Sequence, residues 1–86
     1  MDDKHLVNLM RKPNMGPVLD LIIEMANLTI KEEKSIRLCM QKDMTQYEAA
    51  EFINRSEDAV QKWYSSGKKK LHAVCDGVWW IEKLAE

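Results

Sequence analysis

MTQYEAAEFINRSEDAVQKWYSSGKKK, residues 44–70, is the stretch of the chain with the clearest local signals. Thr45 and Glu48 form the Ser/Thr-x-x-Glu pattern of a capping box, which predicts that a helix begins at this point. Asn54 tolerates the left-handed conformation of a tight turn, so we expect the helix to end there. Ser56 is a favourable N-cap for a second helix. The stretch therefore predicts two helices joined by a tight turn.

The spacing of residues within this stretch is typical of a helix-turn-helix. Ala50 provides a small residue where the two helices touch, Asn54 provides the turn, and Val60 provides an apolar anchor on the second helix. Ile53 and Trp63 supply the flanking core positions. Because the second helix of such a motif lies in the major groove of DNA, the spacing indicates a small DNA-binding protein.

The composition is that of one soluble globular domain, residues 1–86. A chain of 86 residues with 45% apolar and 31% charged residues can form a single modest core. No apolar run approaches the roughly 20 residues of a membrane span. The N-terminus lacks the features of a signal peptide. We therefore expect a cytoplasmic protein that does not enter a membrane.

Cysteines and histidines do not form the clusters that metals require. Cys39 and Cys75 are far apart, and His5 and His72 form no ligand pair, so we expect buried thiols and no metal site. The sequence also contains no glycine-rich phosphate loop and no nucleophile–base pairing. It predicts no enzyme, no catalytic residue and no cofactor.

The charge of the chain is unevenly distributed. Its net charge is −1, which is unfavourable for binding to phosphates. Residues 55–72 contain five cations and two anions, so this segment carries +3 and the remainder carries −4. A basic end on an acidic body is compatible with DNA binding.

Two helices are expected in the N-terminal part of the chain. Residues 3–11 form the first, and the turn-forming residues 12–16 end it. Pro17 is well placed at the start of the second, residues 17–25, which is apolar on most of its sides. Such a helix is either an internal core helix or the contact with a second copy in a homodimer.

A second capping box, Thr29 with Glu32, predicts a third helix that runs to about Gln41. The domain then divides into an N-terminal helical extension at residues 1–27, a helix-turn-helix core at 28–71 and a C-terminal segment at 72–86.

The C-terminal segment has two interpretations. Asp76-Gly77 is a hairpin signal, and Val78 to Ile81 favour strands, which together predict a β-hairpin wing. The competing pattern is helical, because apolar residues recur every three or four positions from Leu71 to Leu84. We favour the helix. The expected fold is all-α, a small bundle of four to five helices, with a winged helix-turn-helix as the alternative.

Half of the chain resembles region four of bacterial sigma factors and the small sigma-like regulators of phages. The matching positions are Leu28-Thr29, Glu32, Thr45, Glu48-Ala49-Ala50, Ser56, Ala59-Val60 and Lys69-Lys70-Leu71. The resemblance implies DNA binding through the second helix of the motif. Arg55 departs from the family, which usually has an apolar residue after the turn.

The chain also resembles the excisionase and MerR-like winged helix-turn-helix group. The matching positions are Glu48-Ala49-Ala50, Ser56, Val60, Trp63, Gly67-Lys68 and Trp79 to Ile81. The spacing from Gly67 to the tryptophans is about one residue longer than in that group. This resemblance implies DNA binding through the same helix.

The candidate DNA-binding residues follow from a helix that starts near Ser56 with Val60 and Trp63 facing inward. Its outward residues are then Glu57, Asp58, Gln61, Lys62 and Ser65. Among these, Gln61 has the geometry to read adenine, Lys62 to contact guanine or phosphate, and Glu57 to accept from cytosine. The residues expected on phosphates are Arg55, Ser56, Lys68, Lys69 and Lys70.

We therefore expect a sequence-specific transcriptional regulator of phage or mobile-element type that binds double-stranded DNA. The alternative is a protein-interaction module of the same fold that inhibits or adapts a polymerase or nuclease complex. The apolar helix at residues 17–25 and the pair Trp79-Trp80 favour that alternative, since an exposed tryptophan is a candidate protein contact.

Overall fold

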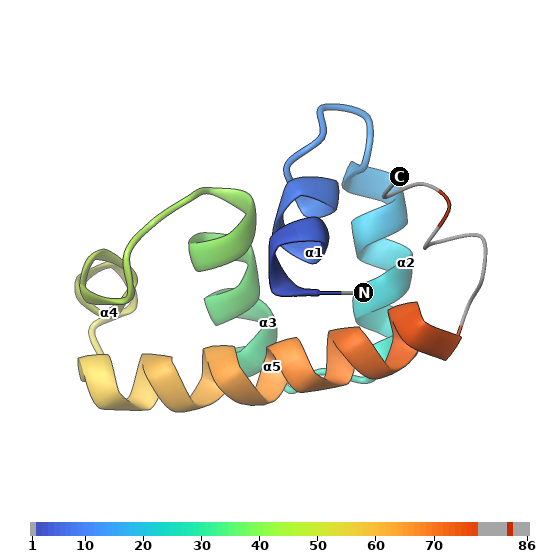
Figure 1. Ribbon diagram of the computed structural model, residues 1–86. Coiled ribbons are helices and arrows are strands. Elements are labelled where there is room, and N and C mark those ends of the chain that lie inside the picture. The colour runs from blue at the N-terminus through green and yellow to red at the C-terminus, as the bar shows by residue number, and fades with distance from the viewer. Residues whose placement is uncertain (1, 78–82, 84–86) are drawn as a thin grey trace.

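A computed structural model describes residues 2–77 and 83. These residues form helices joined by loops and turns, and none of them is in a strand (Figure 1). The all-α prediction is confirmed. The elements in chain order are α1 (Asp3–Met10), α2 (Gly16–Ala26), α3 (Ile30–Ile36), a π-helical segment η1 (Arg37–Gln41), α4 (Gln46–Ile53) and α5 (Glu57–Gly77).

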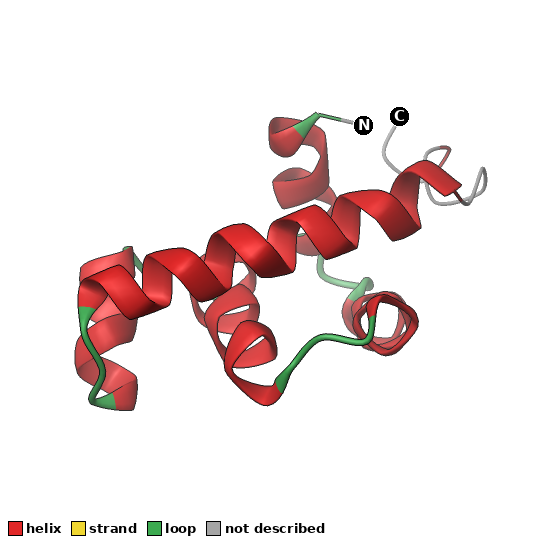
Figure 2. Ribbon diagram, turned by 90° about the horizontal axis from the view of Figure 1, so that it is seen from below, coloured by secondary structure: helices red, strands yellow, loops and turns green. Residues whose placement is uncertain are grey.

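Helix α5 is the element on which the other helices are assembled. It has 21 residues, which corresponds to a length of roughly 31 Å at 1.5 Å per residue. Helices α2, α3 and α4 all pack against it, and α1 packs against η1 and reaches α5 through Asp3. Figure 2 shows α5 running across the whole molecule with the other helices behind it.

Two groups of buried side chains lie along α5. The larger group joins α1, α2, α3, η1 and the C-terminal half of α5, and includes Leu6, Leu9, Leu19, Ile22, Ile36, Met40, Leu71 and Cys75. The smaller group lies under α4 and consists of Leu38, Cys39, Ala49, Ala50 and Val60. Tyr64 of α5 packs against both groups, so it connects the two parts of the core.

Both predicted capping boxes are present. Thr45 Oγ1 accepts from the Glu48 amide at 3.1 Å, and Glu48 Oε1 accepts from the Thr45 amide at 3.1 Å. The same reciprocal pair joins Thr29 and Glu32 at 3.2 and 2.9 Å. Each pair satisfies amide groups that a helix N-terminus leaves without a partner, which explains why α3 and α4 begin where they do.

The turn between α4 and α5 also matches the prediction. Asn54 is left-handed with φ of 56°, and the Arg55 amide donates to Ala50 O at 2.9 Å, which closes the C-terminal end of α4. Ser56 Oγ accepts from the Ala59 amide at 3.1 Å and so caps α5. Val60 is fully buried beneath the turn. Arg55 does not disturb the turn because its side chain is exposed.

Helix α2 is mainly a core helix. Leu19, Ile22 and Ile23 are buried, while Leu21 and Met25 remain 44% and 48% exposed. The helix therefore packs one face into the core and exposes the other, so it is not buried on all sides. The contact with a second copy remains a prediction, and it now rests on these two exposed side chains.

The alternative fold with a C-terminal wing is wrong at its predicted turn. Asp76 and Gly77 are the last two residues of α5 and do not form a hairpin. Leu71 and Cys75, one helical turn apart, are both fully buried in the larger core, and this packing holds the chain helical up to Gly77. The tryptophan pair and the rest of the expected wing, residues 78–81, lie outside the described residues.

Candidate nucleic-acid interface

The outward face of α5 carries the polar residues that the sequence predicted. Asp58, Gln61 or Lys62, Ser65 and Lys69 follow one another at intervals of three or four residues along the helix, and all five are exposed. Together with Ser66 they line a shallow depression of about 530 Å³. In the view of Figure 2, the α5 ribbon lies in front of the other described helices.

The inward face of the same helix segment holds α5 in place. Val60 is fully buried, and Trp63 is half-buried against the smaller core group, as predicted. Lys31 of α3 places its ammonium group 5.1 Å from the centre of the Trp63 ring, a cation–π contact. The polar face of α5 is therefore supported by packing on its opposite side.

The residues at the turn come immediately before the polar face along the chain. Glu57 is exposed in the first turn of α5, and the Ser56 hydroxyl caps that helix. Arg55 is exposed, and its Nη1 donates to the neighbouring Asn54 carbonyl at 3.1 Å. Its side chain lines a depression next to Trp63 on the side of α3, away from Gln61 and Lys62.

The three consecutive lysines do not act as one basic patch. Lys68 Nζ lies 3.0 Å from Asp3 Oδ2 of α1 and also lies over the Tyr64 ring. Lys70 Nζ lies 2.8 Å from Glu32 Oε1 of α3. Only Lys69 of the three points outward, and it makes no ion pair within the described residues. Successive residues are separated by 100° around a helix, so the three side chains cannot share one face.

Glu32 is the buried partner that binds the third of these lysines. Its side chain accepts hydrogen bonds from the Thr29 amide, the Ser66 hydroxyl and Lys70, and the residue is only 4% exposed. Burial by itself raises the pKa of Glu32, but the hydrogen bonds from Lys70, Ser66 and Thr29 outweigh it and lower the pKa to about 2. Glu32 is therefore a carboxylate that joins α3 to α5.

Asp3 has a corresponding role on the same stretch of α5. It accepts from His72 and Lys68 of α5, and these two hydrogen bonds lower the pKa of Asp3. Asp3 therefore connects the start of α1 to the C-terminal half of α5. The sequence did not reveal Asp3 or Glu32 as partners, because both are far from the lysines along the chain.

The charges that remain on the open face are nearly balanced. Lys62 and Lys69 are exposed cations, and Glu57 and Asp58 are exposed anions at the start of the helix. These acids favour the positive end of the helix dipole but repel phosphates. The face therefore has little net positive charge with which to attract phosphates.

Other kinds of site receive no support from the described residues. No group of histidine, cysteine or acidic side chains among residues 2–77 and 83 could hold a metal ion. Cys39 and Cys75 are buried thiols, as predicted, and burial raises the pKa of Cys39. None of the described helices is long and apolar enough to span a membrane.

No protein-family model, curated protein or solved structure matches this chain.

Proposed function

We propose that this protein is a small DNA-binding regulator, of phage or mobile-element type, that reads the major groove with the N-terminal half of α5. The observation that carries the proposal is the polar face of Gln61, Lys62, Ser65 and Lys69, which follows a regular helix–turn–helix connection and is not covered by another described helix. A major groove about 12 Å wide admits one α-helix.

The residues of this face have distinct roles in the proposal. Gln61 is suited to a bidentate contact with adenine, and Lys62 to guanine or to a phosphate. Glu57 accepts from cytosine, and Lys69 contacts a phosphate further along the groove. Ser65, between them, is placed to donate to a base or a phosphate.

The structure reduces the number of lysines available to phosphates. Lys68 and Lys70 are held by Asp3 and Glu32, so a contact with DNA would require them to leave an ion pair. We therefore assign the phosphate contacts chiefly to Lys62 and Lys69. Two such contacts correspond to a slope of about −2 in a plot of log affinity against log salt concentration.

Binding by a single copy is expected to be weak, so we propose that two copies bind two half-sites. The exposed Leu21 and Met25 of α2 are the proposed contact between the copies. A dimer places two recognition helices about one helical turn of DNA apart, near 34 Å.

The experiment that tests this function is selection of bound duplexes from a random pool, followed by a footprint on the selected sequence. The proposal predicts an enriched motif with two related half-sites. Recovery of unenriched sequences at low salt, with no footprint, would contradict it.

A further inference from the structure

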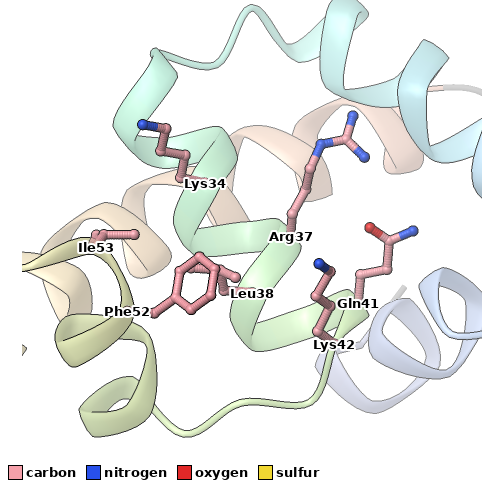
Figure 3. Close-up of a pocket in the computed structure, with 7 residues that line it drawn as sticks. All are labelled: Lys34, Arg37, Leu38, Gln41, Lys42, Phe52 and Ile53. Atoms are coloured by element: carbon pink, nitrogen blue, oxygen red, sulfur yellow. The ribbon is translucent and has the colours of Figure 1, made fainter.

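A concave surface lies between η1 and α4, on the side of the molecule away from the open face of α5. It encloses about 390 Å³, and its apolar lining consists of Leu38, Phe52 and Ile53 (Figure 3). Phe52 is 68% exposed, whereas Leu38 is only 6% exposed. The depression therefore offers an unoccupied apolar floor.

The charged residues around this floor are all cations. Lys34, Arg37 and Lys42 line the depression, and no carboxylate is among its lining residues. Arg37 is neutralised by Asp20 at 2.7 Å and Glu33 at 3.1 Å. Lys34 and Lys42 are exposed and form no ion pair with any described residue.

A second depression of about 230 Å³ continues this surface toward α5. It shares Lys34 and Ile53 with the first and adds Ile30, Lys31, Arg55 and Trp63. Ile30 is 76% exposed, so the apolar floor also continues. No acidic residue lines this second depression. We call the two depressions together the α3–α4 groove.

Single exposed apolar residues are common on protein surfaces and need no explanation. The α3–α4 groove differs because its apolar residues lie in a concavity and because its cations are gathered in a chain whose net charge is −1. An apolar floor with a rim of one sign of charge is complementary to a partner that has an apolar stripe and the opposite charge.

We propose that the α3–α4 groove binds an acidic amphipathic helix of another protein. One large apolar side chain of that helix packs between Leu38 and Phe52, and its carboxylates pair with Lys34 and Lys42. A second apolar residue, one or two turns away, reaches Ile30, and a further carboxylate reaches Arg55. Nucleic acid would satisfy the cations but would leave the apolar floor without a partner, so the lining favours a peptide.

The groove and the open face of α5 lie on different sides of the molecule. In Figure 3, α5 passes behind α3 when the groove is seen from the front. The two surfaces share no lining residue. A partner in the groove therefore leaves Gln61 and Lys62 accessible, and this inference does not depend on DNA binding.

The test uses three synthetic peptides of about four helical turns. The first has leucine or phenylalanine at positions i, i+4 and i+7 with glutamate elsewhere, the second is the same composition scrambled, and the third replaces every glutamate with lysine. Binding to the full chain is followed by NMR chemical-shift changes, which locate the site. We expect the first peptide to shift Leu38, Phe52 and Ile53 and to bind at least about tenfold more tightly than either control peptide.

Matched variants assign the binding to the groove. Lys34→Glu with Lys42→Glu is expected to weaken the acidic peptide about tenfold or more, and Phe52→Ala by a similar factor. Lys62→Glu with Lys69→Glu makes the same change of charge on α5 and should leave the affinity within about twofold. Circular dichroism checks that each variant folds.

Three results would overturn the proposal. These are equal binding of the ordered and scrambled peptides, equal loss of affinity from the α5 variant, and shifts at Leu38 and Phe52 that occur with a DNA duplex but not with the acidic peptide. The last result would assign the groove to nucleic acid.

Discussion

Lys70 Nζ lies 2.8 Å from Glu32 Oε1, and this ion pair joins the middle of α5 to the first turn of α3. The Glu32 carboxylate is almost completely buried, and the same side chain caps α3 through the Thr29 amide. Lys70 therefore neutralises a buried carboxylate that stabilises the fold. This relationship removes from the proposed DNA interface a lysine that the sequence had placed there.

Glu32→Gln is expected to destabilise the fold by about 2–3 kcal/mol, because it removes a buried charge and leaves Lys70 without its partner. The free energy of unfolding is measured with urea for the variant and the parent. Glu24→Gln, an exposed carboxylate on α2, is the matched control and should change the stability by less than about 0.5 kcal/mol. Equal losses in the two variants would show that the ion pair does not stabilise the fold.

The loss of stability at low pH should depend on the pKa of Glu32. The pKa of this group is lowered on folding from 4.5 to about 2, so its charged form contributes stability above the unfolded value. That contribution is lost as the pH falls from about 4.5 toward 2. Urea midpoints between pH 6 and pH 2 are therefore expected to decline less steeply in Glu32→Gln than in the parent. Parallel curves for the two proteins would rule out this assignment.

Gly67→Ala should destabilise the protein even though alanine favours helices by about 1 kcal/mol. A Cβ at Gly67 would lie 2.8 Å from Cγ1 and 3.2 Å from Cδ1 of the fully buried Ile36. Overpacking of this kind typically costs 1–3 kcal/mol, so we expect a net loss of about 1 kcal/mol. Gly77→Ala is the control, because nothing lies within 4 Å of its added Cβ. A melting temperature of Gly67→Ala at or above that of the parent would contradict the close approach of α3 and α5.

The sequence predicted the local features of this fold well because they depend on neighbouring residues. The capping boxes at Thr29 and Thr45 and the turn at Asn54 each require hydrogen bonds only within a few positions. The core role of the helix at residues 17–25 followed from its apolar content. The sequence favoured a helix up to Gly77 over a hairpin but did not decide between them. The choice depends on the burial of Leu71 and Cys75 in the larger core group, which is a tertiary contact.

The features that the sequence did not reveal depend on tertiary contacts. The separation of Lys68, Lys69 and Lys70 follows from the helix geometry, but their partners Asp3 and Glu32 depend on how α1 and α3 pack against α5. The sequence did not single out Lys31, Lys34 and Lys42, the lysines of the α3–α4 groove. The fold shows that these lysines surround a groove, because it places Phe52 and Ile53 of α4 next to them.

The lysines of α5 are expected to differ in their effect on DNA affinity. Lys62→Ala and Lys69→Ala should each reduce the magnitude of the salt slope by about 1, because each removes one phosphate contact. Lys68→Ala should leave the slope nearly unchanged, since Asp3 already pairs with Lys68. The slopes are measured by fluorescence anisotropy on the selected duplex over a range of salt concentrations. A larger change for Lys68→Ala than for Lys62→Ala would reverse our assignment of these side chains.

The most direct test of the proposed function compares two Gln-Lys dipeptides that lie on different sides of the molecule. Gln61-Lys62 lies on the open face of α5, and Gln41-Lys42 lines the α3–α4 groove. We predict that Gln61→Ala with Lys62→Ala abolishes the footprint on the selected duplex while the variant remains folded. Gln41→Ala with Lys42→Ala should preserve the footprint. An unchanged footprint with the first variant, or equal loss with both, would contradict DNA reading by α5.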